Sequence, residues 1–116
     1  MNENIIEQKS KFFALRIINL YKYLTQEKNE YILSKQILRS GTSIGANVRE
    51  SKRAQSRLDF YSKLNIALKE AEESLYWLEL LQESGYLEKQ ETMSLYIECE
   101  ELVKILVSIT KNKEND

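Results

Sequence analysis

The stretch that decides the fold is Ser56–Leu87, SRLDFYSKLNIALKEAEESLYWLELLQESGYL. Its apolar side chains recur every three or four residues, the spacing that places them on one face of an α-helix. They are Phe60, Leu64, Ala67, Leu68, Ala71, Leu75, Leu78 and Leu81. Ser56 and Asp59 have the spacing of an N-terminal cap, and Gly85 stands where a C-terminal cap is expected. The pattern predicts a helix over residues 57 to 84.

The same spacing predicts two further helices at the ends of the chain. The first is expected at residues 4 to 26, with an apolar face of Ile6, Phe13, Ile17, Leu20 and Leu24. The last is expected to end near residue 111, with an apolar stripe of Met93, Tyr96, Cys99, Val103, Leu106 and Thr110. In the first helix, Phe12, Leu15, Ile18 and Tyr21 widen the apolar surface, which implies a second contact surface.

A helix containing two glycines is expected to begin near Tyr31. Its inner face carries Leu33, Ile37, Ser40, Ile44, Val48 and Ser51. Gly41 and Gly45 each cost about 1 kcal/mol relative to alanine inside a helix, a cost that close approach of another helix would explain. The alternative is a break, with Gly41 as a C-terminal cap and Asn47 with Glu50 as a capping box that starts a new helix. The pattern favours the continuous helix.

Four helices with short connections predict an all-α fold, an antiparallel up-and-down four-helix bundle that forms one domain over residues 1–116. The polar residues 26 to 30 are one such short connection. Without a bilayer-spanning apolar run or the features of a signal peptide, we expect no membrane contact and a cytoplasmic location.

The composition excludes several kinds of chemistry. The chain of 116 residues has no histidine and one cysteine, Cys99. It therefore has no internal disulfide and no Ser–His or Cys–His nucleophile pair, and the glutamate clusters lack the histidines of a di-iron site. Cys99, on an apolar stripe, is expected to be a buried and inert thiol. We expect no catalytic residues, no metal and no cofactor, so the sequence predicts a protein that is not an enzyme.

The net charge of −1 conceals an uneven distribution. Residues 69 to 101 carry ten glutamates against two lysines, a net charge of −8. Residues 35 to 57 carry a net charge of +5, from one glutamate and the basic residues Lys35, Arg39, Arg49, Lys52, Arg53 and Arg57. On a continuous helix, the first five of these basic residues fall within an arc of about 140°, which predicts a basic ridge.

The candidate binding residues are therefore Arg39, Arg49, Lys52, Arg53 and Arg57. Three interpretations remain open for them: contact with nucleic-acid phosphates, contact with an acidic protein or a neighbouring subunit, and solvation alone. A second group is interpreted as a structural polar motif whose side chains hydrogen-bond across helices and set their register. It comprises Ser43, Asn47, Glu50, Glu70 and Tyr76.

Three segments carry a family resemblance: Arg39–Ser51 (RSGTSIGANVRES), Asp59–Ala71 (DFYSKLNIALKEA) and Tyr76–Leu81 (YWLELL). Over nearly the whole chain, the sequence resembles the four-helix-bundle proteins encoded in intervening sequences of bacterial 23S ribosomal RNA genes. It departs from the family pattern at Ser51, where many members have glycine. The resemblance implies a continuous second helix and a homo-oligomer, a ring of five. Related accessory subunits of diversity-generating retroelements resemble basic rings that bind nucleic acid and a reverse transcriptase.

The sequence and the resemblance together predict a non-enzymatic, oligomeric bundle that acts as a scaffold. Its expected partners are copies of itself, and RNA, DNA or a nucleic-acid-processing protein bound through the basic ridge. The alternative is a protein-only interaction or regulatory module without nucleic-acid contact.

Overall fold

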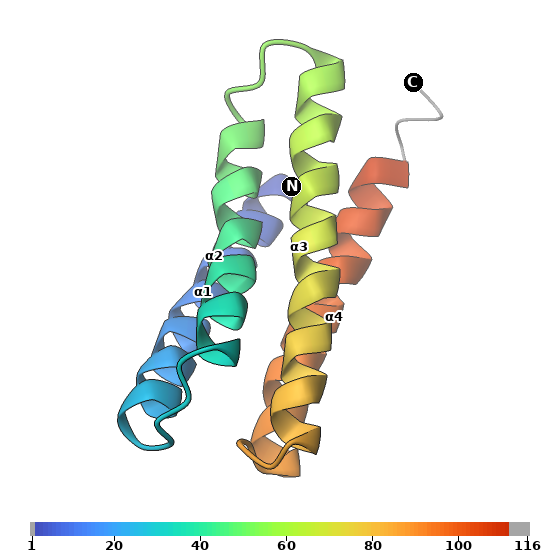
Figure 1. The fold of residues 1–116 in the computed structure, drawn as a ribbon. Coiled ribbons are helices and arrows are strands. Elements are labelled where there is room, and N and C mark those ends of the chain that lie inside the picture. The colour runs from blue at the N-terminus through green and yellow to red at the C-terminus, as the bar shows by residue number, and fades with distance from the viewer. Residues whose placement is uncertain (1, 112–116) are drawn as a thin grey trace.

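The computed structural model describes residues 2–111, and their side chains from residue 5 onward. These residues form four α-helices and no strands, which confirms the all-α prediction. The helices are α1 (Asn2–Gln26), α2 (Leu33–Ser51), α3 (Arg57–Glu83) and α4 (Lys89–Lys111). In Figure 1 the chain runs down α1, up α2, down α3 and up α4. Each helix packs against the next along the chain, and α1 also meets α4 in a less extensive contact.

The predicted apolar faces of α1 and α3 form the core. All five residues of the predicted α1 face are buried. On α3, Leu64, Ala67, Ala71, Leu78 and Leu81 are buried, whereas Phe60, Leu68 and Leu75 pack against the core while partly exposed. Ser56 accepts a hydrogen bond from the Asp59 N–H at 3.0 Å, which confirms the predicted N-terminal cap of α3.

The predicted apolar stripe of α4 is wrong at most of its positions, because the buried residue is the one before the predicted residue. The residues that are buried are Thr92, Leu95, Cys99, Leu102, Leu106 and Ile109, while Met93 is 51 % exposed. A shift of one residue turns a helix face by about 100°, and this segment has apolar residues on both faces. Leu95 and Leu102 enter the core. Thr92 tolerates burial because its hydroxyl donates to the Glu88 carbonyl at 2.8 Å.

Helix α2 is continuous through both glycines, which confirms the predicted continuous helix and excludes the alternative of a break at Gly41. A Cβ atom at Gly41 would lie 2.9 Å from two side-chain carbons of Ile17 on α1. One at Gly45 would lie 3.3 Å from the Ser10 hydroxyl oxygen, also on α1. The missing side chains therefore let α1 and α2 approach closely, and this explains two glycines inside a helix.

The connection between α1 and α2 contains a buried carboxylate that the sequence did not reveal. Glu30, which is 7 % exposed, accepts hydrogen bonds from the backbone N–H groups of Ile32, Leu33 and Ser34 at 3.2, 2.9 and 2.7 Å. Asn29 before it has a φ of 54° and turns the chain back. Glu30 thus caps α2, which begins at Leu33, two residues later than expected.

Replacing Glu30 with glutamine is expected to lower the free energy of unfolding by about 1 to 2 kcal/mol at pH 7, as for other lost caps. Burial alone would raise the pKa of the Glu30 carboxyl, but the three backbone hydrogen bonds outweigh it and hold the pKa below its ordinary value. Glu30 therefore contributes fully above the pKa of an unfolded glutamate, about 4.3, and its contribution is lost as the pH falls through the lower folded pKa. Urea unfolding of both proteins between pH 7 and pH 3 measures this: the difference should shrink with acid, and a constant difference would contradict it.

Candidate nucleic-acid interface

The predicted basic ridge does not lie on a single helix. Arg39 and Arg49 belong to α2, Lys52 and Arg53 follow its end, and Arg57 is the first residue of α3. The helix ends at Ser51 because the following N–H groups bond three residues back, Lys52 to the Arg49 carbonyl at 3.2 Å and Arg53 to the Glu50 carbonyl at 3.0 Å. The ridge is thereby corrected to a cluster around the α2–α3 connection, which lies at the top of the bundle in Figure 1.

Arg39 is held by carboxylates of α3 and stands apart from this cluster. One guanidinium nitrogen lies 3.2 Å from a Glu70 oxygen, and the other pairs with Glu73. Glu73 also accepts a hydrogen bond from the Trp77 indole at 2.8 Å. Since two carboxylates face one guanidinium, Arg39 links α2 to α3 and offers little positive charge to a ligand.

The basic cluster consists of Arg49, Lys52, Arg53 and Arg57. Arg49 and Lys52 share one carboxylate of α1, because Glu7 lies 3.7 Å from the Arg49 Nε and 3.1 Å from the Lys52 Nζ. The Arg49 side chain is still 68 % exposed. Arg53 and Arg57 are exposed, and Arg53 has no ion-pair partner within residues 5–111. The cluster therefore keeps an excess of positive charge at the surface.

The predicted polar motif does not join the helices as expected. Ser43 donates to the Arg39 carbonyl at 2.7 Å and Asn47 to the Ser43 carbonyl at 2.9 Å, so both bond within α2. Glu50 pairs with Lys63 at 3.3 Å, and Glu70 pairs with Arg39. Tyr76 is 53 % exposed. Of the five residues, Glu50 and Glu70 do connect α2 with α3, through ion pairs with other side chains.

The hydroxyl pair that links α2 and α3 was missed in the sequence. Ser40 and Ser74 are both fully buried, and their hydroxyl oxygens lie 2.8 Å apart. Ser74 interrupts the apolar face of α3 between Ala71 and Leu78. A serine at such a core position is the signal that could have revealed the pair, because a buried hydroxyl needs a partner.

Charge is segregated between the two helical hairpins. Residues 1–56 carry ten lysines and arginines against five glutamates, whereas residues 57–116 carry seven basic residues against thirteen acidic ones. Because α1 packs against α2 and α3 against α4, the α1–α2 side of the bundle is basic and the α3–α4 side is acidic. The near-zero net charge thus conceals two sides of opposite sign.

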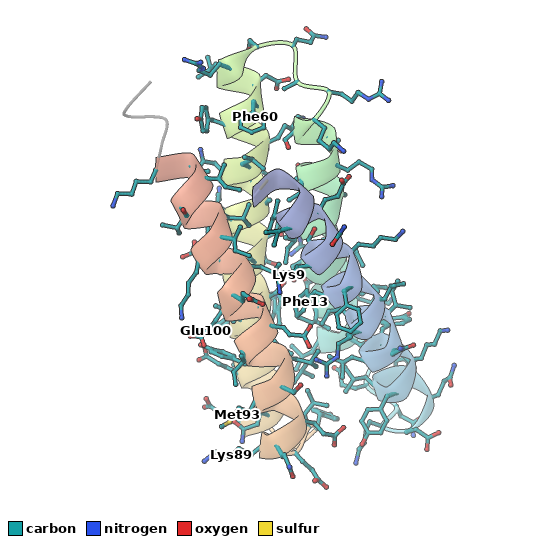
Figure 2. All side chains as sticks on the ribbon, turned by 180° about the vertical axis from the view of Figure 1, so that it is seen from behind. Lys9, Phe13, Phe60, Lys89, Met93 and Glu100 are labelled. Carbon is teal, nitrogen blue, oxygen red and sulfur yellow. The ribbon has the colours of Figure 1, made fainter. Side chains whose placement is uncertain are left out.

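Among the shallow grooves between neighbouring helices, two border the N-terminal half of α1. The α1–α4 groove has a volume of about 510 Å³ and is lined by Gln8, Lys9, Phe12, Glu98, Glu101 and Leu102. The ion pair of Lys9 with Glu101, at 3.2 Å, crosses it, and Figure 2 shows Lys9 between the two helices. The α1–α2 groove has a volume of about 430 Å³ and is lined by Glu7, Lys11, Ala14, Thr42, Gly45, Ala46, Arg49 and Glu50.

Cys99 is buried, as expected, and its Sγ atom lies 3.2 Å from the Ala71 carbonyl oxygen. Burial, with a smaller contribution from Glu100, raises the pKa of the Cys99 thiol to about 12. The thiolate needed for nucleophilic or redox chemistry is therefore scarce at neutral pH.

Within the described part of the chain, no three Cys, Asp or Glu side chains come close enough together to hold a metal ion. None of the four helices combines the length and hydropathy that crossing a bilayer requires.

The sequence model of the 23S rRNA-intervening sequence proteins matches residues 2–108. The chain belongs to this family. It is also similar to a crystal structure of a protein of unknown function from the S23 ribosomal protein family of Bacteroides thetaiotaomicron. The two are 55 % identical, the TM-score is 0.94, and the similarity covers 96 % of this chain and 99 % of that one. No protein with a curated description matches the chain. Membership in the 23S rRNA-intervening sequence family thus confirms the resemblance seen in the sequence.

Proposed function

We propose that this member of the 23S rRNA-intervening sequence family is a non-enzymatic, oligomeric scaffold of the cytoplasm that binds RNA through the basic cluster. This proposal rests on the excess of positively charged side chains at the α2–α3 connection. Four basic side chains surround it, and the nearby carboxylates are Glu7, shared by two of them, and Asp59. Glu50 is engaged by Lys63.

Arginine dominates this cluster, and its chemistry suits phosphate. A guanidinium presents a planar fork of N–H donors that matches phosphate oxygens, and it stays charged at all physiological pH values. Contacts of this kind position a nucleic acid without reading its sequence. The basic α1–α2 side also draws an anionic chain toward the cluster, while the acidic α3–α4 side repels it and so orients the encounter.

The proposed subunit is an antiparallel up-and-down bundle that assembles into a homo-oligomer. Two exposed apolar surfaces support this. One lies on α1, with Ile5, Phe12 and Leu15 exposed by 44, 59 and 53 %. The other lies on α4, with Met93, Ile97 and Val107 exposed by 51, 58 and 44 %, and Figure 2 shows Met93 on the side of α4 that faces away from α1.

Because the two surfaces differ, a contact between the α1 surface of one copy and the α4 surface of the next is heterologous, and such contacts form a ring when the rotation between successive copies closes. We propose a ring of five, as the resemblance implies. A ring would repeat the basic cluster once per subunit, and several weak phosphate contacts then act together.

The second candidate is a protein-only partner that offers carboxylates to the same cluster. The ion pairs of Arg39 with Glu70 and Glu73 favour it, because they show carboxylates binding an arginine of the same helix, α2, outside the cluster. Pull-downs with and without nuclease separate the candidates: a partner that survives nuclease treatment supports the protein-only module.

The double charge reversal Arg49→Glu with Arg53→Glu tests RNA binding. Removing two phosphate contacts is expected to weaken binding by at least about tenfold and to lower the slope of log K against log salt by roughly 2. Fluorescence anisotropy with labelled RNA measures binding, and sedimentation checks that the assembly is unchanged. The matched control is Lys69→Glu with Lys104→Glu on the acidic side, which should have a smaller effect. Unchanged RNA binding by the variant with Arg49 and Arg53 reversed would contradict the proposal that the basic cluster binds RNA.

A further inference from the structure

The α1–α2 groove adjoins the basic cluster, because Arg49 belongs to both. Its lining includes the short side chains of Ala14, Thr42 and Ala46, together with Gly45. Such a shallow and smooth floor lets a polymer backbone come close to the helices. Lys11 on α1 and Arg49 on α2 supply a cation from each helix to the groove.

The carboxylates in this groove are already compensated. Glu7 pairs with both Arg49 and Lys52, and Glu50 pairs with Lys63. Lys11 is exposed and has no ion-pair partner among the described residues. The groove therefore offers one unpaired ammonium group and one largely exposed guanidinium to an anionic chain.

Among the side chains that the structure describes, none that lines the groove is aromatic. The aromatic residues that the described chain exposes most are Phe12, Tyr23, Tyr31 and Tyr76, none of which borders it. Proteins that hold single-stranded nucleic acid usually stack its bases on aromatic rings. A duplex keeps its bases stacked on one another and presents its phosphates outward, so it needs no such rings.

We propose that the α1–α2 groove binds the phosphate backbone of a nucleic-acid duplex, with Lys11 as a further phosphate contact beside Arg49. This inference rests on the proposed function and specifies its ligand. The shared chemistry is the phosphate backbone of paired strands, and RNA and DNA duplexes are separate arms of the test.

The test compares a duplex RNA, a duplex DNA and a single-stranded RNA of equal length, each labelled for anisotropy at low and physiological salt. At least one duplex is expected to bind at least about tenfold more tightly than the single strand. Lys11→Glu should weaken duplex binding by about tenfold, and Lys11→Gln by less, with the salt slope reduced by about 1 for the lost contact. Lys104→Glu on α4, the matched control, should change neither quantity comparably.

A neutral substitution separates the shape of the groove from its charge. Ala46 is exposed on the groove floor, so Ala46→Leu adds bulk without altering charge or the helix. It is expected to weaken duplex binding about tenfold while circular dichroism and sedimentation stay unchanged. If single strand and duplex bound equally, and the Lys11 and Ala46 variants bound like the wild type, the proposal that the groove binds a duplex would be overturned. In that case, loss of binding on charge reversal of Arg49 and Arg53 would still uphold the proposed function. No binding of any nucleic acid by the wild type would overturn both.

Discussion

Replacing Phe13 with alanine is expected to lower the free energy of unfolding by about 3 to 5 kcal/mol, the usual cost of removing a large aromatic side chain from a core. Phe13 is completely buried on α1 and belongs to the central apolar cluster. The neighbouring helices are held at fixed distances by their own packing, so they can fill the resulting cavity only in part. Equilibrium unfolding in urea, monitored by circular dichroism, measures the change.

The matched control is the same substitution at the preceding residue. Phe12 is 59 % exposed. At a protein concentration where subunits are separate, Phe12→Ala should change the free energy of unfolding by less than about 0.5 kcal/mol, as exposed substitutions do. At higher concentration it should weaken assembly, since Phe12 lies on the proposed α1 contact surface. Equal destabilisation by the two substitutions would contradict the assignment of the α1 core face.

Gly41→Leu is expected to destabilise the protein by about 3 kcal/mol, the upper part of the usual range for overpacking. Even the first added carbon would lie 2.9 Å from Ile17, which is itself fully buried and cannot move aside freely. Leucine stabilises a helix relative to glycine by about 1 kcal/mol, so the energetic cost of the clash with Ile17 must be larger than this gain. Urea unfolding again provides the measurement.

Gly45→Leu is the control for this experiment, because it makes the same change one turn along the same helix. Gly45 borders the open α1–α2 groove, into which a longer side chain can turn. We expect a loss less than half as large as at Gly41. If Gly41→Leu were neutral, the close approach of α1 and α2 would not be what places glycine there.

Local pattern was sufficient to predict the core faces of α1 and α3. The residues with three-and-four spacing face the core on both helices, although Phe12 and Leu15 add a second, exposed apolar surface to α1. On α4 the apolar residues Met93 and Ile97 compete with Leu95, and the pattern cannot choose between faces that are both apolar. The choice depends on which face meets α1 and α3, and that is set by tertiary packing.

The candidate site was predicted less completely, because its charges depend on contacts between helices. The ion pairs of Arg39 with Glu70 require the relative register of α2 and α3, which no periodicity within one helix contains. The inward turn of Glu30 depends in the same way on the position of the first N–H groups of α2. Composition did predict where basic residues concentrate, but the structure alone shows which of them are neutralised.

A salt titration of RNA binding by the wild-type protein, from low to physiological ionic strength, tests most directly whether the basic cluster binds phosphate. We expect measurable affinity at physiological salt and a linear fall of log K with log salt whose slope reports several phosphate contacts, about 0.7 to 0.9 per contact. An absence of binding even at low salt would contradict RNA binding and assign the basic cluster to protein or subunit contacts.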